Sequence, residues 1–414
     1  MSSPTLEQQR ELYRLMALTR RLDQEAVALQ RQGELTAFPP LTGQEAAQVG
    51  SAYALEAQDF AFPSYRELGV AVVRGVDLVE YLLAYRGDWN GGLYDPFAHN
   101  FGPIASSVGS HSLHAVGWAM GAALDGGGRA AIVYFGEGAT SEGDVHEAMN
   151  FAGVFKAPIV FFVQNNQWAI SVPLDRQTAG PIHRKAEGYG FPGVRIDGND
   201  VLEVHRATSE ALERARSGGG PTLIDALTYR VGPHSTADDP NRYRSPAEVD
   251  PWREQDPLVR FRAALGDEAF CARVEKDNEQ LVTAIRARLV STPAPDPEEM
   301  FDFAYAEPPA GLARQREELR RSLSSPSSRP STRRSATPWP VTRAPWSSAR
   351  TWADWAASSG SPTGSRRSSA RGASSTPRWP SRASWGPPSG SRSRVGGRSA
   401  RSSSTASATR RSTR

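Results

Sequence analysis

The chain has 414 residues, which is room for one large domain or two ordinary ones. Its formal net charge of +3 combines two unlike parts: residues 322–414 hold 17 arginines against one acid, Asp354, so the first 321 residues carry −13. A single cysteine, Cys271, excludes an internal disulfide, and no apolar run approaches the ~18 residues of a membrane span. The charged N-terminus lacks the apolar core of a secretory signal, so we expect a cytoplasmic protein without a membrane partner.

Apolar residues at helical spacing predict several helices in the first third of the chain. A long amphipathic helix is predicted over 5–32, ending at Gly33, and a second over 42–55. The segment 62–67 follows an apolar run and precedes another helix. A Gly- and Ala-rich helix is predicted over 113–124.

The strongest pattern lies in residues 130–171. Two short apolar runs, Ala130–Phe135 and Pro158–Val163, have the Ile, Val, Phe and Tyr content of strands buried on both faces of a parallel sheet. Between them Gly143–Phe155 has helical spacing. Because parallel neighbours need a crossover, the pattern predicts a strand, turn, helix, strand unit. We therefore predict an α/β fold with a parallel sheet flanked by helices.

Polar and glycine residues follow both strands. The first run ends in Gly136-Glu137-Gly138, and Asn166 stands just beyond the second. In an open α/β sheet, ligands bind at these carboxyl ends. The glycines let the backbone approach a phosphate, and the amides that follow, including that of Ala139, point at it. One carboxylate and one amide oxygen beside a diphosphate are suitable ligands for Mg²⁺.

Gly-Glu-Gly followed by Asn-Asn about thirty residues later resembles the thiamin diphosphate motif. The stretch GEGATSEGD…NF…VQNNQWAIS resembles the alpha chain of the decarboxylating first component of the 2-oxo acid dehydrogenase complexes. The glutamate at position 137 is similar to that of the branched-chain members, which have Glu where most of the superfamily has Asp. This resemblance implies Mg²⁺ held by Glu137, Asn166 and the main-chain carbonyl of Trp168. On the motif alone, the alternative is a glycine turn and an Asn-rich loop in another α/β enzyme.

The resemblance covers roughly residues 5–321 and implies further cofactor contacts. It places Tyr65 and Arg66 at thiamin diphosphate, with the Arg66 guanidinium on the diphosphate. Without the resemblance, a surface arginine paired with a neighbouring acid is the alternative. The aminopyrimidine ring would be held by backbone groups of Ser106 and Val108.

The turn before residue 113 differs from that of the branched-chain relatives. Those proteins build a potassium site there, but Ala105, Ser110 and His111 do not reproduce its side-chain oxygens, so the ion is not carried over. His111 and His114 could be catalytic, but we favour packed or solvated histidines.

Farther along, the pattern predicts a strand and turn over 194–200, a helix over 201–216 and a strand over 221–229. The polar, turn-rich segment that follows, 229–240, is expected to be a mobile loop at the edge of the active site. Helices are predicted over 250–266 and 267–290, and a last amphipathic helix within 301–323.

The loop carries the predicted catalytic residue. The resemblance gives His234 a role in binding the cofactor and passing the acyl group to lipoamide, and it makes Arg230 its basic neighbour. A lone loop histidine is otherwise a solvated one. Ser235 matches a regulatory phosphorylation position in mitochondrial relatives, and we favour a turn-capping hydroxyl there.

As a whole, the resemblance implies the alpha subunit of a 2-oxo acid dehydrogenase. Such an enzyme decarboxylates its substrate with thiamin diphosphate and Mg²⁺ and transfers the acyl group to a lipoyl acyltransferase component. In the family the beta chain supplies the carboxylate at the aminopyrimidine, so an α2β2 heterotetramer is expected. Branched-chain 2-oxo acids are the favoured substrates; pyruvate dehydrogenase and acetoin dehydrogenase activities are the alternatives.

Residues 322–414 have a different composition. They lack Lys, Glu, Ile, Phe and Tyr and hold six of the ten tryptophans. Arg-rich tails bind nucleic acid, which gives a second class of function. However, the codons for two segments, 350–364 and the one from 370, can be read one nucleotide out of register. In that frame they can encode the start of a beta chain. We therefore hypothesise a disordered, out-of-frame tail; stop codons in that neighbouring frame would refute this.

Overall fold

The computed structural model describes residues 4–88, 91–126, 128–302 and 304–324. Its centre is a five-stranded parallel sheet in the order β1-β2-β3-β7-β6, which confirms the predicted α/β class. No helix within these described ranges is long and apolar enough to cross a membrane. The tail from 325 onward, with the frame hypothesis and the nucleic-acid alternative, lies outside the described residues. The strands are β1 Phe60–Phe62, β2 Ala131–Gly136, β3 Ile159–Asn165, β6 Gly193–Asp197 and β7 Thr222–Leu227, and a hairpin is formed by β4 Trp168–Ala169 and β5 Val172–Pro173.

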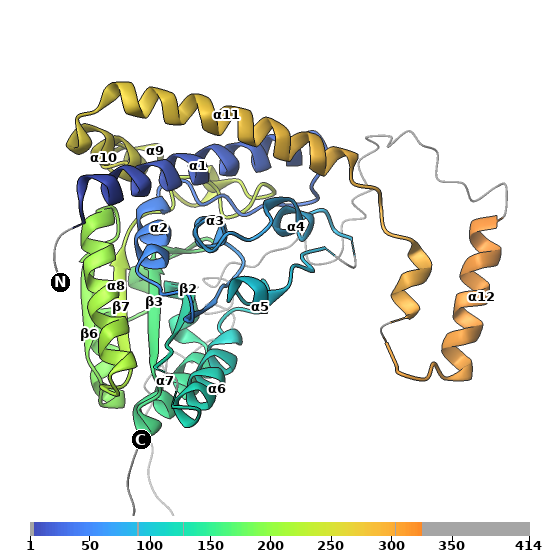
Figure 1. Ribbon diagram of the computed structural model, residues 1–414, viewed down its shortest axis with the longest axis horizontal. Coiled ribbons are helices and arrows are strands. Elements are labelled where there is room, and N and C mark those ends of the chain that lie inside the picture. The colour runs from blue at the N-terminus through green and yellow to red at the C-terminus, as the bar shows by residue number, and fades with distance from the viewer. Residues whose placement is uncertain (1–3, 89–90, 127, 303, 325–414) are drawn as a thin grey trace, which may run out of the picture. The chain divides into compact units, whose positions relative to one another are not determined.

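Helices surround this sheet (Figure 1). The α-helices are α1 Leu6–Arg31, α2 Glu45–Tyr53, α3 Leu68–Arg74, α4 Leu78–Leu83, α5 Pro96–His99, α6 His111–Leu124, α7 Gly143–Phe155, α8 Val201–Arg216, α9 Pro246–Glu254, α10 Pro257–Leu265, α11 Glu268–Ser291 and α12 Ala310–Ser324. The 3₁₀ helices are η1 Glu137–Ser141, η2 Leu174–Arg176, η3 Ile182–Tyr189, η4 Pro240–Arg242 and η5 Pro297–Phe301.

Successive side chains of each strand face opposite layers, as the two-residue period of a strand requires. On β2, Ile132 and Tyr134 join a core formed with α1, α2 and α8. Val133 and Phe135 join a second core formed with α6, α7 and η3. All four side chains are buried. Because both faces of the strand are covered, its sequence is a continuous run of apolar and aromatic residues.

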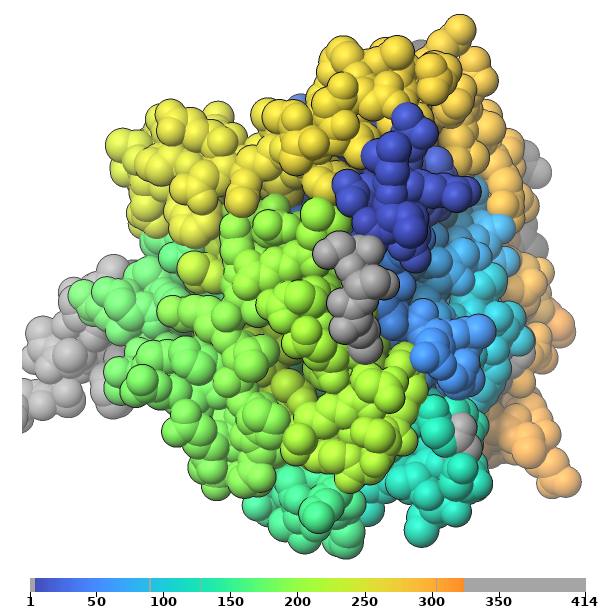
Figure 2. Space-filling view, turned by 60° about the vertical axis from the view of Figure 1, so that its left-hand side comes forward, coloured from blue at the N-terminus to red at the C-terminus, as the bar shows by residue number. Residues whose placement is uncertain are grey.

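The first helix is held by the last helices of the body. Helix α1 packs against α2, α10 and α11, and Figure 2 shows its N-terminal part in dark blue beside the yellow part of the chain that contains α10 and α11. Arg20 on α1 pairs with the buried Glu45 of α2 and with Asp256 at 2.9 Å. Glu25 on α1 pairs with Arg286 of α11. Segments more than 200 residues apart thus close one side of the molecule.

The predicted helices over 5–32, 143–155 and 201–216 are confirmed by α1, α7 and α8. The prediction of one helix over 250–266 is wrong, because the chain breaks into α9 and α10. Pro257 cannot donate an amide hydrogen bond and starts α10, while the Asp256 carboxylate caps it.

The last predicted helix, within 301–323, is confirmed by α12. It begins at Ala310, directly after a pair of prolines, and none of its residues from 310 to 323 is buried. The short η5 precedes it, and Arg316 of α12 lies over the Phe301 ring of η5, 5.5 Å from the ring centre.

Two helix glycines should respond oppositely to alanine. A Cβ on Gly153 of α7 would lie 2.2 Å from the Tyr189 carbonyl oxygen of η3, whereas one on Gly121 of α6 meets nothing within 4 Å. We expect Gly153→Ala to lower the free energy of unfolding by about 1–3 kcal/mol, because η3 must move. Gly121→Ala should raise it by up to ~1 kcal/mol through helix propensity.

Denaturant unfolding of the full chain measures both changes. Gly121→Ala is the matched control for the loss of a helix glycine, and equal effects at the two positions would contradict the packing argument.

Candidate active site

The carboxyl ends of β2 and β3 meet at a cavity of about 230 Å³. These strands are in parallel register up to Gly136 beside Gln164, so the residues that follow each strand come together. The cavity is lined by Gln44, Ser64, Tyr65, Arg66, Glu67, Val108, Gly109, His111, Phe135, Gly136, Glu137, Gly138, Ala139, Glu142, Gln164, Asn166, Trp168, Ala169, Ile170 and His234.

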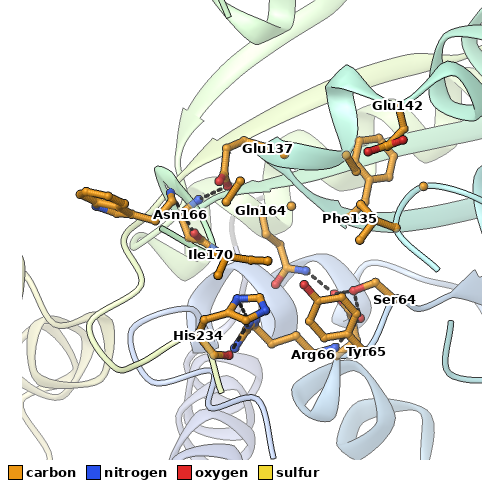
Figure 3. A pocket seen from close by; sticks show the side chains of 18 of the residues that line it. Ser64, Tyr65, Arg66, Phe135, Glu137, Glu142, Gln164, Asn166, Ile170 and His234 are labelled. Atoms are coloured by element: carbon orange, nitrogen blue, oxygen red, sulfur yellow. Dashed lines mark hydrogen bonds between the residues drawn. The ribbon is translucent and has the colours of Figure 1, made fainter. Parts of the chain in front are cut away.

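The three predicted metal ligands all line this cavity. Glu137 is 1% exposed, and its Oε2 accepts the main-chain N–H of Asn166 at 3.1 Å, as Figure 3 shows. The Asn166 Oδ1 accepts the N–H of Trp168 at 3.2 Å. Burial raises the pKa of the Glu137 carboxyl, opposed by the hydrogen bonds that it accepts and by the charge of Arg230.

Close packing explains one of the two glycines of the motif, Gly138. A Cβ on Gly138 would lie 2.7 Å from the Cβ of Ala169, so the η1 turn and the β4–β5 hairpin could not approach as they do. A Cβ on Gly136 would meet no atom within 4 Å. Packing therefore requires glycine at 138, whereas glycine at 136 leaves open space beside the cavity.

Arg230 lies behind the site and does not line the cavity. Its side chain is 1% exposed, and it donates through Nη1 to the carbonyl of Trp168 at 2.8 Å and through Nη2 to that of Ile170 at 2.5 Å. Gln167 and Ile170 both have positive φ, at 69° and 56°. The guanidinium thus stabilises an unusual turn that carries a predicted ligand carbonyl.

Arg66 lines the cavity, but its guanidinium is bonded within the protein. Nη1 donates to the Pro40 carbonyl, and Nη2 donates to the His234 carbonyl at 3.0 Å and to His234 Nδ1 at 3.3 Å (Figure 3). Since a guanidinium only donates, Nδ1 must accept, and the proton of neutral His234 lies on Nε2. Burial, and then the charges of Arg66 and Arg230, lower the pKa of His234 to about 4.

A buried polar group forms the floor of the cavity. The Glu67 carboxylate accepts hydrogen bonds from Ser64 Oγ at 2.8 Å, the Arg66 N–H at 3.1 Å and Gln164 Nε2 at 2.5 Å. Gln164 in turn accepts from Gln48 Nε2 at 2.8 Å. Burial raises the pKa of the Glu67 carboxyl. This network fixes the segment that carries Tyr65 and Arg66.

The turn before α6 is more open. Val108 lines the cavity with about half of its surface exposed, whereas Ser106 is exposed and is not among the lining residues. His111 is buried and hydrogen-bonds through Nε2 to the Tyr134 carbonyl at 2.8 Å, and burial lowers its pKa. His114 is exposed. His111 is therefore a packed, neutral histidine at the cavity wall.

The residues present fit Mg²⁺ and a diphosphate. Glu137, Asn166 and Trp168 offer a carboxylate, an amide oxygen and a carbonyl oxygen, which are hard ligands. A cation would stabilise the ionised form of the buried Glu137 carboxyl. The Trp168 carbonyl has a second lone pair beside the one that Arg230 uses. The open space at Gly136 is room for a phosphate.

Comparison with known proteins places this arrangement in a family. Residues 13–288 match the profile of the dehydrogenase E1 component family. The chain belongs to this family. It is 51% identical over 320 residues, 76% of its own length and 87% of the relative's, to the 3-methyl-2-oxobutanoate dehydrogenase subunit alpha of Mycobacterium tuberculosis. It is 40% identical over 321 residues to the pyruvate dehydrogenase E1 component subunit alpha of Bacillus cereus (75% of this chain and 85% of that one) and of Staphylococcus aureus (76% and 86%).

Several cavity residues of this E1 component were not predicted from the sequence. Gln164 directly follows the apolar run Pro158–Val163, at the carboxyl end of β3 where ligands bind, so its position could have been used to predict it. Glu67 and Ser64 stand beside the predicted Tyr65 and Arg66 and look like ordinary surface residues in the sequence. Gln44 lies about 120 residues before Asn166, and only the fold brings it to the cavity.

The low pKa of His234 predicts a pH effect on stability. Because the folded-state pKa of about 4 lies below the ordinary value of 6.5, His234 contributes stability that is present above about pH 6.5 and lost as pH falls through 4. His234→Gln removes this titration. Its free energy of unfolding should therefore fall less than the wild type's between pH 6.5 and 4, as denaturant unfolding at each pH would measure. Identical pH profiles would rule out a depressed pKa.

Proposed function

We propose that this chain is the alpha subunit of a branched-chain 2-oxo acid dehydrogenase that holds the Mg²⁺–diphosphate half of a thiamin diphosphate site. Two facts support it together: Glu137 and Asn166 meet at adjacent strand ends, and the chain is 51% identical to a 3-methyl-2-oxobutanoate dehydrogenase subunit alpha. Members of this family generally use thiamin diphosphate and Mg²⁺. When bound, the cofactor supplies the electron sink for loss of CO2 from a 2-oxo acid.

The residues of this chain would bind and orient Mg²⁺ and the diphosphate of the cofactor. Glu137, Asn166 and the Trp168 carbonyl would hold Mg²⁺, and the amides of Gly138 and Ala139 would face the diphosphate. Arg66 would have to share its donors, now on Pro40 and His234, to reach a phosphate oxygen. Ser106 and Val108 stay proposed as backbone contacts to the aminopyrimidine.

His234 is the proposed catalytic residue of the loop. Its Nδ1 accepts from Arg66, so the neutral ring offers its Nε2–H as a hydrogen-bond donor during passage of the acyl group to a lipoyl group. The main-chain N–H of His234 donates to Asp238 at 2.8 Å, and the Tyr65 ring lies edge-on with ring centres 6.0 Å apart. These contacts keep the imidazole at the cavity wall.

A partner must complete the site. No carboxylate of the described residues is assigned to the aminopyrimidine, and we propose that a beta subunit supplies it in an α2β2 assembly that works with a lipoyl acyltransferase component in the cytoplasm. The proposed metal ligands are buried in this chain, whereas residues 231–240 of the loop are half-buried or exposed, which leaves loop surface for a partner.

Decarboxylation assays of the alpha–beta complex test the function. With thiamin diphosphate and Mg²⁺, kcat/KM for 3-methyl-2-oxobutanoate should exceed that for pyruvate by about tenfold or more, the discrimination that a pocket shaped for extra methyl groups provides. A preference for pyruvate would overturn the branched-chain assignment. It would favour pyruvate dehydrogenase activity, for which the relatives at 40% identity are named.

Glu137→Ala should abolish Mg²⁺-dependent binding of thiamin diphosphate by the same complex while leaving the fold intact. The change removes a metal ligand, so the charge of the diphosphate is poorly neutralised. Calorimetric titration measures the affinity, and Glu147→Ala, which removes an exposed carboxylate of α7, is the control. Unchanged affinity of the Glu137 variant would refute the metal assignment.

A further inference from the structure

One buried amide beside the proposed metal site has an unused donor. Gln44 precedes the first residue of α2, its side chain is 0% exposed, and it lines the cavity. Its Oε1 accepts a hydrogen bond from Asn166 Nδ2 at 3.3 Å. Its Nε2 has no hydrogen-bond partner among the described residues. An unpaired buried donor is unfavourable, so a polar atom inside the cavity is its expected partner.

The fold fixes the position of Gln44, and its side chain does not cap the helix that follows. Gln44 is the N-cap residue of α2, yet its side chain makes no capping hydrogen bond. A Cβ at the preceding Gly43 would lie 2.9 Å from the Tyr229 carbonyl oxygen, so the backbone here runs tightly against the end of β7. The side chain is therefore directed inward, toward the end of β3, rather than to solvent or to the helix amides.

The contact with Asn166 determines how that residue presents its amide. Because Nδ2 donates to Gln44, the Asn166 Oδ1 is left on the opposite side, where it accepts the Trp168 N–H and faces the proposed metal. An amide turned the other way would offer N–H groups to a cation. A contact that orients a metal ligand in this way normally affects metal affinity.

We propose that Gln44 is a further binding residue of the Mg²⁺–diphosphate site, with its Oε1 orienting Asn166 and its Nε2 donating to a phosphate oxygen. This inference rests on the proposed function. The ligand chemistry follows from the geometry: the donor lines the cavity beside Asn166, where an anion that binds the same metal would lie. Gln44 would thus act as a hydrogen-bond donor to the diphosphate without adding charge.

Two substitutions separate the roles of the two amide atoms. Gln44→Glu keeps an oxygen that can accept from Asn166 Nδ2 but replaces the donor with an anionic acceptor. Gln44→Met has a similar volume and removes both contacts. A role in packing alone would be largely preserved by methionine.

A second buried amide provides the matched control. Asn278 of α11 also has a buried Nδ2 without a partner among the described residues, and it is not among the cavity-lining residues. Asn278→Leu therefore tests what removal of such a group does to the protein as a whole.

The experiment is calorimetric titration of thiamin diphosphate into the alpha–beta complex, at saturating Mg²⁺ and again across a range of Mg²⁺ concentrations, with thermal unfolding in parallel. Gln44→Glu should raise the Kd for thiamin diphosphate about tenfold or more, the effect of losing a hydrogen bond to a charged acceptor. Gln44→Met should raise the Kd and also the Mg²⁺ concentration needed for half-maximal binding. Asn278→Leu should leave both quantities unchanged.

The outcomes separate this inference from the proposed function. If the wild-type complex binds no thiamin diphosphate at any Mg²⁺ concentration, the proposed function itself fails. If it binds, and Gln44→Glu has a Kd within twofold of the wild type, the assignment of Gln44 is overturned. The Kd of the glutamate variant decides this test even if the methionine variant does not fold.

Discussion

A buried carboxylate at the end of one strand, tied to the main chain at the end of the next, is the constraint on which the site depends. Glu137 is almost fully buried and accepts the Asn166 N–H, so β2 and β3 must end side by side. Such a carboxylate is stable as an anion only with hydrogen bonds and nearby positive charge. The Asn166 N–H and the positive charge of Arg230 contribute to both requirements.

The arginines around the cavity act mainly on backbone carbonyls. Arg230 holds Trp168 and Ile170, Arg66 holds Pro40 and His234, and Arg244 donates to the carbonyls of residues 230–232. Charge-assisted hydrogen bonds of this kind are stronger than neutral ones. They order irregular segments that regular secondary structure cannot hold, and they leave positive potential where an anion would enter.

The sequence predicted the sheet, its central crossover and half of the residues that line the cavity, because two buried strands and the glycines between them have strong local signals. The family resemblance was confirmed. Ser106 and Arg230 show the limit: the structure places neither among the lining residues, and their cofactor contacts stay predictions. Gln44 and Glu67 depend on contacts with Asn166 and Gln164, about 100 residues away, which no local pattern encodes.

The Arg66 contacts also bear on how the protein reaches its native state. They join residues 40, 66 and 234, and Arg244 closes the loop behind them. Contacts so distant in sequence form late, since the intervening chain must first lose its conformational entropy. On the ribosome, the cavity can be completed only after Arg244 has emerged, when all five strands of the central sheet have already emerged but α9, α10 and α11 have not. Nascent chains shorter than this would have the strands of the site but not the Arg244 contacts to the carbonyls of residues 230–232.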